Sequence, residues 1–274
     1  MQPAQALDQD EHLGKRPKGA AYVTLLIGAP EGEAEVKAMR SQLGGIGHLQ
    51  SKAAYLNRTI CFQNRLRELN SSYPLVVVHD FKEDISAHFD RTIRVSDSYI
   101  ASRKQTLQAL HLNKFLAWTL VEYERVILMD SDVYIRVLPD ELMRLTLDAG
   151  TTIAAAQNCA EMFNTGFIVI TPSMRTFCGL QNMRIRPRHA CTGNFFGDQS
   201  YINTYFISTY GNHSYTKIDG KWNSVYKYHG VPILVKADEN VHFTGSHKPP
   251  WGDHGRCIHH TYTKTKAKMV APVK

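Results

Sequence analysis

Two aspartates separated by one residue, Asp130 and Asp132, directly follow a short apolar run in the segment RVILMDSDVYIR (residues 125–136). The run is continuous and lacks the polar face of a helix, which predicts a buried central strand. On extended backbone the two carboxylates would project to the same side, where a divalent cation would relieve their repulsion. Oxygen ligands of this kind favour Mg²⁺ or Mn²⁺ over zinc. The alternative is an ordinary solvated turn after a strand.

The surrounding pattern predicts an α/β fold that would position these carboxylates. Strands and helices alternate through the first 170 residues, which is typical of a mostly parallel sheet covered by helices. Ligands bind such sheets beyond the carboxyl ends of the strands, where Asp130 falls. The predicted strands are 21–27, 75–78, 91–95, 126–129, 151–156, 167–170, 231–235 and 241–243. The predicted helices are 31–42, 58–69, 82–89, 107–123, 174–181 and 197–206, with loops at 44–56 and 211–229.

Composition indicates a soluble globular protein, with 274 residues of which 43% are hydrophobic and 21% charged. We expect a flexible tail at 1–20, a single domain at 21–262 and a basic tail at 263–274. No apolar run approaches the roughly 18 residues that a membrane span needs, and the first residues lack a hydrophobic signal core. The sequence therefore predicts a cytoplasmic protein with no membrane partner.

The cysteines and the charge distribution narrow the class of ligand. Five scattered cysteines without a Cys-x-x-Cys pair favour reduced thiols, and the segment HGRCIHH (residues 254–260) lacks the second cysteine pair of a zinc cluster. From Thr171 onward the chain has 14 Lys and Arg against 5 Asp and Glu. A basic half facing an acidic centre suits a phosphorylated ligand. Stacking aromatics are not interleaved with these lysines, which argues against a nucleic-acid module but leaves general polyanion binding open.

Five segments fall in one order between about residue 21 and residue 251. They are AYVTLL, LNKFLAWTLVEYERVILMDSDVYI, FNTGFIVITPS, GDQSYINTYF and VHFTGSHKPPW. With these motifs the chain resembles the family 8 retaining glycosyltransferases, most closely the glycogenin branch. The resemblance implies a GT-A fold, a Rossmann-like α/β/α sandwich with a mostly parallel central sheet. It also implies a UDP-sugar as donor substrate and Mn²⁺ as cofactor, with Mg²⁺ as the alternative.

The resemblance assigns the metal to three residues, Asp130, Asp132 and His242. Judged by itself, His242 would have been interpreted as a buried structural histidine. The resemblance also places Asp198 and Gln199 beside the anomeric carbon, where they are the candidate catalytic groups. Asp198 alone has a second interpretation, as the N-cap of the helix that follows it.

Further donor contacts follow from the same comparison. Lys114 matches a helix lysine that reaches the donor site and is a third candidate catalytic residue, although most helix lysines are merely solvated. The remaining UDP-sugar contacts are Leu25 beside the uracil, Ser131 between the aspartates, Asn164 and Thr165 at the sugar, Gly245 near the phosphates, and Lys248 on the diphosphate. Retention would proceed by front-face attack or by double displacement, and both routes stay open.

The chain departs from the glycogenin pattern in four places. The arginine expected upstream of the helix lysine is not aligned, although Arg103 and Lys104 are close. Ile27-Gly28-Ala29 stands where glycogenins tend to have Thr-Asn-Asp, and Phe195 stands where they commonly have aspartate. No tyrosine aligns firmly with the self-glucosylated one, although Tyr226 and Tyr228 lie near it. The acceptor is therefore expected to be a protein-linked glycan or another sugar.

The alternatives are a self-glucosylating glycogenin, a galactinol-synthase-like enzyme and an inactive nucleotide-sugar-binding scaffold. A glycoside hydrolase would not need the diphosphate-binding groups. A homodimer is implied by resemblance.

Overall fold

The protein is described by a computed structural model that covers residues 19–42, 50–96, 112–159, 162–183, 197–211, 214–225, 227–228, 231–232 and 236–243. Its centre is a seven-stranded sheet with the order β3-β2-β1-β4-β7-β6-β8. The strands are β1 (Ala20–Leu26), β2 (Leu75–His79), β3 (Arg91–Arg94), β4 (Arg125–Met129), β6 (Ile153–Gln157), β7 (Phe163–Ile170) and β8 (Thr216–Ile218).

Most neighbours in this sheet are parallel. Strands β3, β2, β1 and β4 pair in parallel, and so do β6 and β8, whereas β7 runs antiparallel to both β4 and β6. The mostly parallel central sheet predicted from the sequence is thereby confirmed. Since β7 is reversed, its first residues lie at the same edge as the end of β4.

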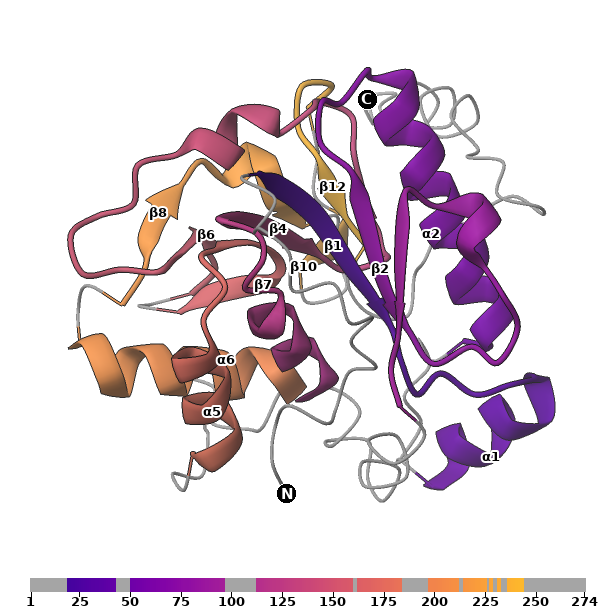
Figure 1. The fold of residues 1–274 in the computed structure, drawn as a ribbon. Coiled ribbons are helices and arrows are strands. Elements are labelled where there is room, and N and C mark those ends of the chain that lie inside the picture. The colour runs from indigo at the N-terminus through magenta and orange to yellow at the C-terminus, as the bar shows by residue number, and fades with distance from the viewer. Residues whose placement is uncertain are drawn as a thin grey trace, which may run out of the picture.

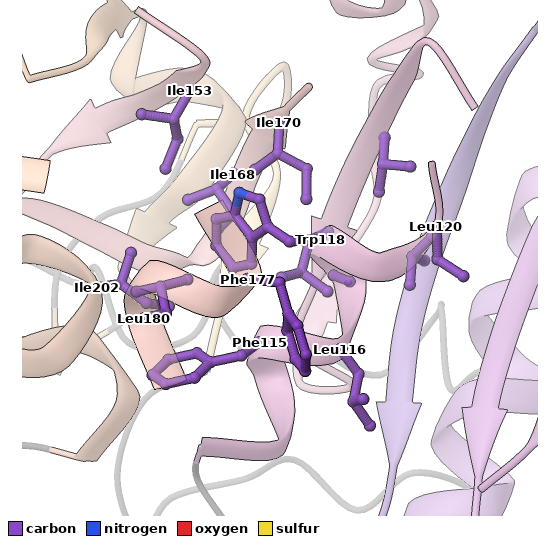
Figure 2. Close-up of a cluster of buried hydrophobic side chains, with 14 of the residues drawn as sticks. Phe115, Leu116, Trp118, Leu120, Ile153, Ile168, Ile170, Phe177, Leu180 and Ile202 are labelled. Carbon is purple, nitrogen blue, oxygen red and sulfur yellow. The ribbon is translucent and has the colours of Figure 1, made fainter. Parts of the chain in front are cut away.

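Helices cover both faces of the sheet, so the fold is an α/β/α sandwich (Figure 1). One face carries η3 (Leu112–Thr119), α5 (Met174–Asn182) and α6 (Gly197–Tyr210), and the other carries α2 (Lys52–Glu68). The sequence of β4 explains both contacts, because its side chains alternate between the faces. Val126 and Leu128 join the core around Trp118, which Figure 2 shows, whereas Ile127 and Met129 join the core around Phe62.

The shorter elements are helices α1 (Glu33–Gln42), η2 (Ser86–His88), η4 (Asp140–Arg144) and η6 (Gly220–Asn223), and two small sheets. One small sheet pairs β10 (Lys227–Tyr228) with β11 (Val231–Pro232). The other has the order β5-β12-β9, with β5 (Val133–Tyr134), β12 (Val241–His242) and β9 (Ser224–Val225). His242 is opposite Val133 in this sheet, so β12 brings a residue from the end of the chain to the turn after β4.

Several predicted elements differ from those in the structure. Helix α2 begins at Lys52, six residues before the predicted start, so the loop predicted at 44–56 is wrong in its last part. Only Ser86–His88 is helical in the predicted helix at 82–89. The helix predicted at 107–123 is a 3₁₀ helix that ends at Thr119, as far as residues from 112 onward show. Strand β8 was missed inside the loop predicted at 211–229, because three residues give too short a pattern.

The cysteine prediction was wrong for two of the described residues. Cys61 and Cys159 are both disulfide-bonded, whereas Cys178 is free. An odd number of scattered cysteines does not reveal which of them pair, because pairing depends on distances in the fold. Among the described elements, none of the helices has the length and apolar character required to cross a membrane.

Candidate functional site

Asp130, Asp132 and His242 come together in a cluster that has the composition of a metal site. One ligand atom from each lies within 4.8 Å of the others. Asp132 and His242 are buried, and His242 Nε2 lies 3.4 Å from Asp132 Oδ1. His242 Nδ1 is also buried and has no hydrogen-bond partner among the described residues. Two carboxylates and an imidazole suit Mn²⁺ or Mg²⁺, so the residues present fit the metal that the sequence predicted.

The turn after β4 fixes the two aspartates through their backbones. The Asp130 N–H donates to the Gly166 carbonyl at 2.8 Å, and the Phe243 N–H donates to the Asp132 carbonyl at 3.0 Å. Gly166 is required on steric grounds as well, since a Cβ at this position would overlap the His242 ring. The glycine of the FNTGF segment therefore allows β7 to pass directly beside the imidazole.

Lys114 links this cluster to helix α6. Its Nζ lies 2.7 Å from Asp130 Oδ1 and 2.6 Å from Asp198 Oδ2, and it donates to the Thr165 carbonyl at 3.2 Å. Asp198 also accepts a 2.7 Å hydrogen bond from Thr165 Oγ1. Asp198 lies inside the first turn of α6 rather than before it, so the N-cap interpretation is wrong. The Lys114 side chain is only 11% exposed, so the interpretation of a solvated helix lysine is wrong as well.

The charges in this group shift one another's proton affinities. Burial disfavours the charged form of Lys114, but the carboxylates of Asp130 and Asp198 outweigh burial and raise the pKa of Lys114. Burial also raises the pKa of Asp130 and outweighs the lowering effect of Lys114, with Asp132 and Asp198 adding to the rise. A divalent cation at the cluster would oppose this rise by stabilising the ionised carboxylates.

Asn164 and Gln199 lie next to this group. Asn164 Oδ1 accepts hydrogen bonds from the Gly166 N–H at 2.8 Å and from Asn223 Nδ2 at 2.9 Å. These two bonds orient the Asn164 amide. Gln199 Oε1 accepts from the Thr165 N–H at 3.4 Å. Asn223 was not assigned by the sequence analysis, because it belongs to a region predicted as loop.

The first strand ends in a fixed arrangement at the same edge. Leu25 is partly buried there, and Gly28 follows with a φ of 76°, a conformation that favours glycine. The Gly28 N–H donates to Asp80 Oδ2 at 2.8 Å, while Lys52 Nζ lies 3.1 Å from Asp80 Oδ1. An ion pair between Lys52, the first residue of α2, and Asp80, directly after β2, therefore lies beside Gly28, where the sequence departs from the glycogenin pattern.

The remaining predicted residues are placed less fully. Ser131 is partly buried in the turn between the two aspartates. Gly245, Lys248 and Tyr226 lie outside the described residues, and Tyr228 is a backbone member of β10.

Two residues of α2, Tyr55 and Arg58, also belong to this neighbourhood, although the sequence analysis gave them no role. The Arg58 guanidinium lies over the Tyr55 ring at 5.1 Å, and the Arg58 residue is only 1% exposed. Burial lowers the pKa of Arg58, and the nearby Tyr55 and Asp132 oppose that shift. The predicted helix began at residue 58, so its first buried turn could not be recognised.

Curated proteins similar to this chain include glycogenins and plant glucuronosyltransferases. UDP-glucuronate:xylan alpha-glucuronosyltransferase 2 of Arabidopsis thaliana is 25% identical over 70% of this chain and 33% of its own length. Human glycogenin-2 is 30% identical over 60% of this chain and 34% of its own length. Rabbit (Oryctolagus cuniculus) glycogenin-1 is 26% identical over 80% of this chain and 67% of its own length. The chain spans about a third of the first curated relatives it matches, and no protein-family model matches it.

Solved glycosyltransferase structures share the fold. The apo bifunctional glycosyltransferase WbbM superposes with a TM-score of 0.57 at 14% identity, over 85% of this chain and 47% of that one. The galactosyltransferase LgtC in complex with donor and acceptor sugar analogs superposes with a TM-score of 0.52 at 12% identity, over 93% and 97% of the two chains. These likenesses confirm the predicted GT-A type of fold. With the curated relatives, they show that the chain is similar in sequence to glycogenins and xylan glucuronosyltransferases and similar in fold to solved glycosyltransferases.

Proposed function

We propose that this chain is a retaining hexosyltransferase that uses a UDP-sugar, UDP-glucose or UDP-galactose, as donor and Mn²⁺ as cofactor. The observation that carries the proposal is the meeting of the Asp130, Asp132 and His242 cluster with the Lys114–Asp198 pair at one edge of the sheet. A glycoside hydrolase would need two carboxyl groups that flank the scissile bond, but it would not need a cation site.

The chain's own residues would divide the work of transfer. Asp130, Asp132 and His242 would hold the cation, which when bound neutralises charge on a diphosphate leaving group. Lys114 would hold Asp130 and Asp198 in place through its ion pairs with both carboxylates. Asp198 would lie beside the developing positive charge of the sugar, and Asn164 would direct its Nδ2 at the donor. Both front-face attack and double displacement are compatible with these roles.

Acceptor, assembly and compartment are part of the proposal. We expect a protein-linked glycan or another sugar as acceptor, and a homodimer by resemblance. For the compartment, the disulfide-bonded Cys61 and Cys159 argue against the cytosolic setting predicted from the sequence, because disulfides persist in oxidising compartments.

The test is UDP release from a panel of donors without acceptor, in the presence of Mn²⁺. The panel contains UDP-glucose, UDP-galactose and UDP-glucuronate, the last because it is in the name of a curated relative. We expect release from one donor, reduced about 100-fold or more in Asp132→Asn, because a lost ligand removes several kcal/mol of transition-state stabilisation. The exposed Asp238→Asn is the matched control. No release from any donor would contradict the proposal.

A further inference from the structure

Arg58 is a buried, positively charged residue near the proposed metal site, and the role inferred for it below rests on the proposed function. Arg58 is 1% exposed, and its guanidinium lies 5.1 Å from the centre of the Tyr55 ring. A buried arginine is expensive to desolvate, so its place in a fold needs a compensating interaction. The Tyr55 ring beside the guanidinium provides one such interaction, through the attraction between a cation and an aromatic ring.

Helix geometry shows which way Arg58 faces. Arg65 follows seven residues later, two turns along the same face and about 10.5 Å along the axis. Arg65 Nε donates to the Ile135 carbonyl at 2.9 Å, so this face of α2 lies along the segment that follows Asp132. Tyr55 packs against the core cluster that contains Met129 and Val133. The first turns of α2 therefore lie on the face of the sheet that carries Met129 and Val133, the residues on either side of the Asp130–Asp132 turn.

Electrostatics agrees with this placement. Burial raises the pKa of Tyr55, and the Asp130 and Asp132 carboxylates are near enough to add to the rise. The Asp132 carboxylate also acts to raise the pKa of Arg58 against its burial. Both residues of α2 thus lie within electrostatic range of the proposed metal ligands.

The charge balance of the site indicates what the positive charge of Arg58 would do. Asp130, Asp132 and Asp198 carry three negative charges, and Lys114 and Arg58 carry two positive ones. A divalent cation would change the net charge of this group from negative to positive. Without Arg58 the same group would be neutral when the cation is bound. Arg58 therefore supplies the positive excess that attracts an anionic ligand.

We propose that Arg58, held in place by Tyr55, is a diphosphate-binding residue of the donor site. Guanidinium groups bind phosphate oxygens through paired N–H donors, which gives them both charge and geometry. The ligand class is a nucleoside diphosphate, and the diphosphate rather than the sugar is the part recognised. A purely structural role, in which Arg58 only balances Asp132, is the alternative that the experiment must separate.

The test compares UDP with uridine, using calorimetric titration in the presence of Mn²⁺ on wild type and Arg58→Met. The neutral side chain of similar length should weaken UDP binding about 10-fold to 100-fold, as expected for a lost charged hydrogen bond. Uridine binding should change less than about 2-fold, since uridine has no phosphate. Arg58→Lys should lie between the two for UDP. Arg67→Met is the matched control, because Arg67 is on the same helix but its side chain is 53% exposed.

Each outcome bears on the inference. Equal weakening of UDP and uridine would indicate a structural role and overturn it, and so would unchanged UDP binding in Arg58→Met. A loss found with UDP-glucuronate but not with UDP would move the contact to a sugar carboxylate and also overturn it. If wild type bound no UDP with Mn²⁺, the proposed function would be wrong and the inference with it.

Discussion

Replacing Lys114 by methionine tests the ion pairs that join the two halves of the site. The Lys114 side chain is 11% exposed, and its partners Asp198 and Asp130 are 14% and 33% exposed. Removing one partner of a buried pair costs about 3–5 kcal/mol, because the other charge is left buried and unpaired. The partial exposure of Asp130 places the expected loss near the lower end, at about 3 kcal/mol. Methionine conserves the length of the side chain, so cavity formation contributes little.

Urea unfolding of the metal-free protein, followed by circular dichroism, measures this loss. The control is Lys236→Met, since the Lys236 side chain is 75% exposed and 3.9 Å from Glu239; it should change stability by less than about 0.5 kcal/mol. In a double-mutant cycle with Asp198→Asn, the combined loss should fall short of the sum by at least about 1 kcal/mol. A loss below about 1 kcal/mol in Lys114→Met, or simple additivity in the cycle, would refute the reasoning.

The other predictions concern Gly166, the pH dependence of Mn²⁺ binding and the cysteines. Gly166→Ala should abolish Mn²⁺ binding, because its Cβ would overlap the His242 ring. The control Gly32→Ala should bind Mn²⁺ normally, since a Cβ at that position has no other atom within 4 Å. Equal Mn²⁺ affinities of the two variants in calorimetry would contradict this prediction. Since the pKa of Asp130 is raised, protons compete with the metal at higher pH than for an ordinary aspartate, so Mn²⁺ affinity should begin to fall well before the pH reaches about 4, the ordinary pKa of an aspartate. An affinity that stays constant down to about pH 4 would be inconsistent with the site. Alkylation of the denatured, unreduced protein should label Cys178 but not Cys61 or Cys159, because these two are disulfide-bonded. Peptide mass spectrometry would read out the labelling, and labelling of all three cysteines would contradict this prediction.

The sheet and the acidic turn were predictable from the sequence because each has a strong local signal. The run before Asp130 is apolar at every position, and buried parallel strands have this pattern whatever surrounds them. His242, which lies beside this turn, had no such signal in the sequence. His242 lies on a strand of two residues, and only the pairing of that strand with β5 places the imidazole beside Asp132.

The roles of Lys114 and Arg58 depended on tertiary structure in the same way. Lys114 has the sequence context of a surface helix lysine, and its burial comes from the packing of η3 against α5 and α6. Arg58 lies near the start of a helix whose first turn has no apolar periodicity strong enough to mark it. The motif resemblance named the first of these residues, but neither propensity nor periodicity reports which charged side chains are buried.

The claim that the Asp130, Asp132 and His242 cluster holds the cation of the donor complex is tested most directly by electron paramagnetic resonance of Mn²⁺. The signal of free aqueous Mn²⁺ is titrated with protein in the presence of UDP. We expect one Mn²⁺ bound per chain in wild type and in the control Asp238→Asn, and no binding in Asp132→Asn or His242→Ala. Equal binding of Mn²⁺ by all four proteins would contradict the account.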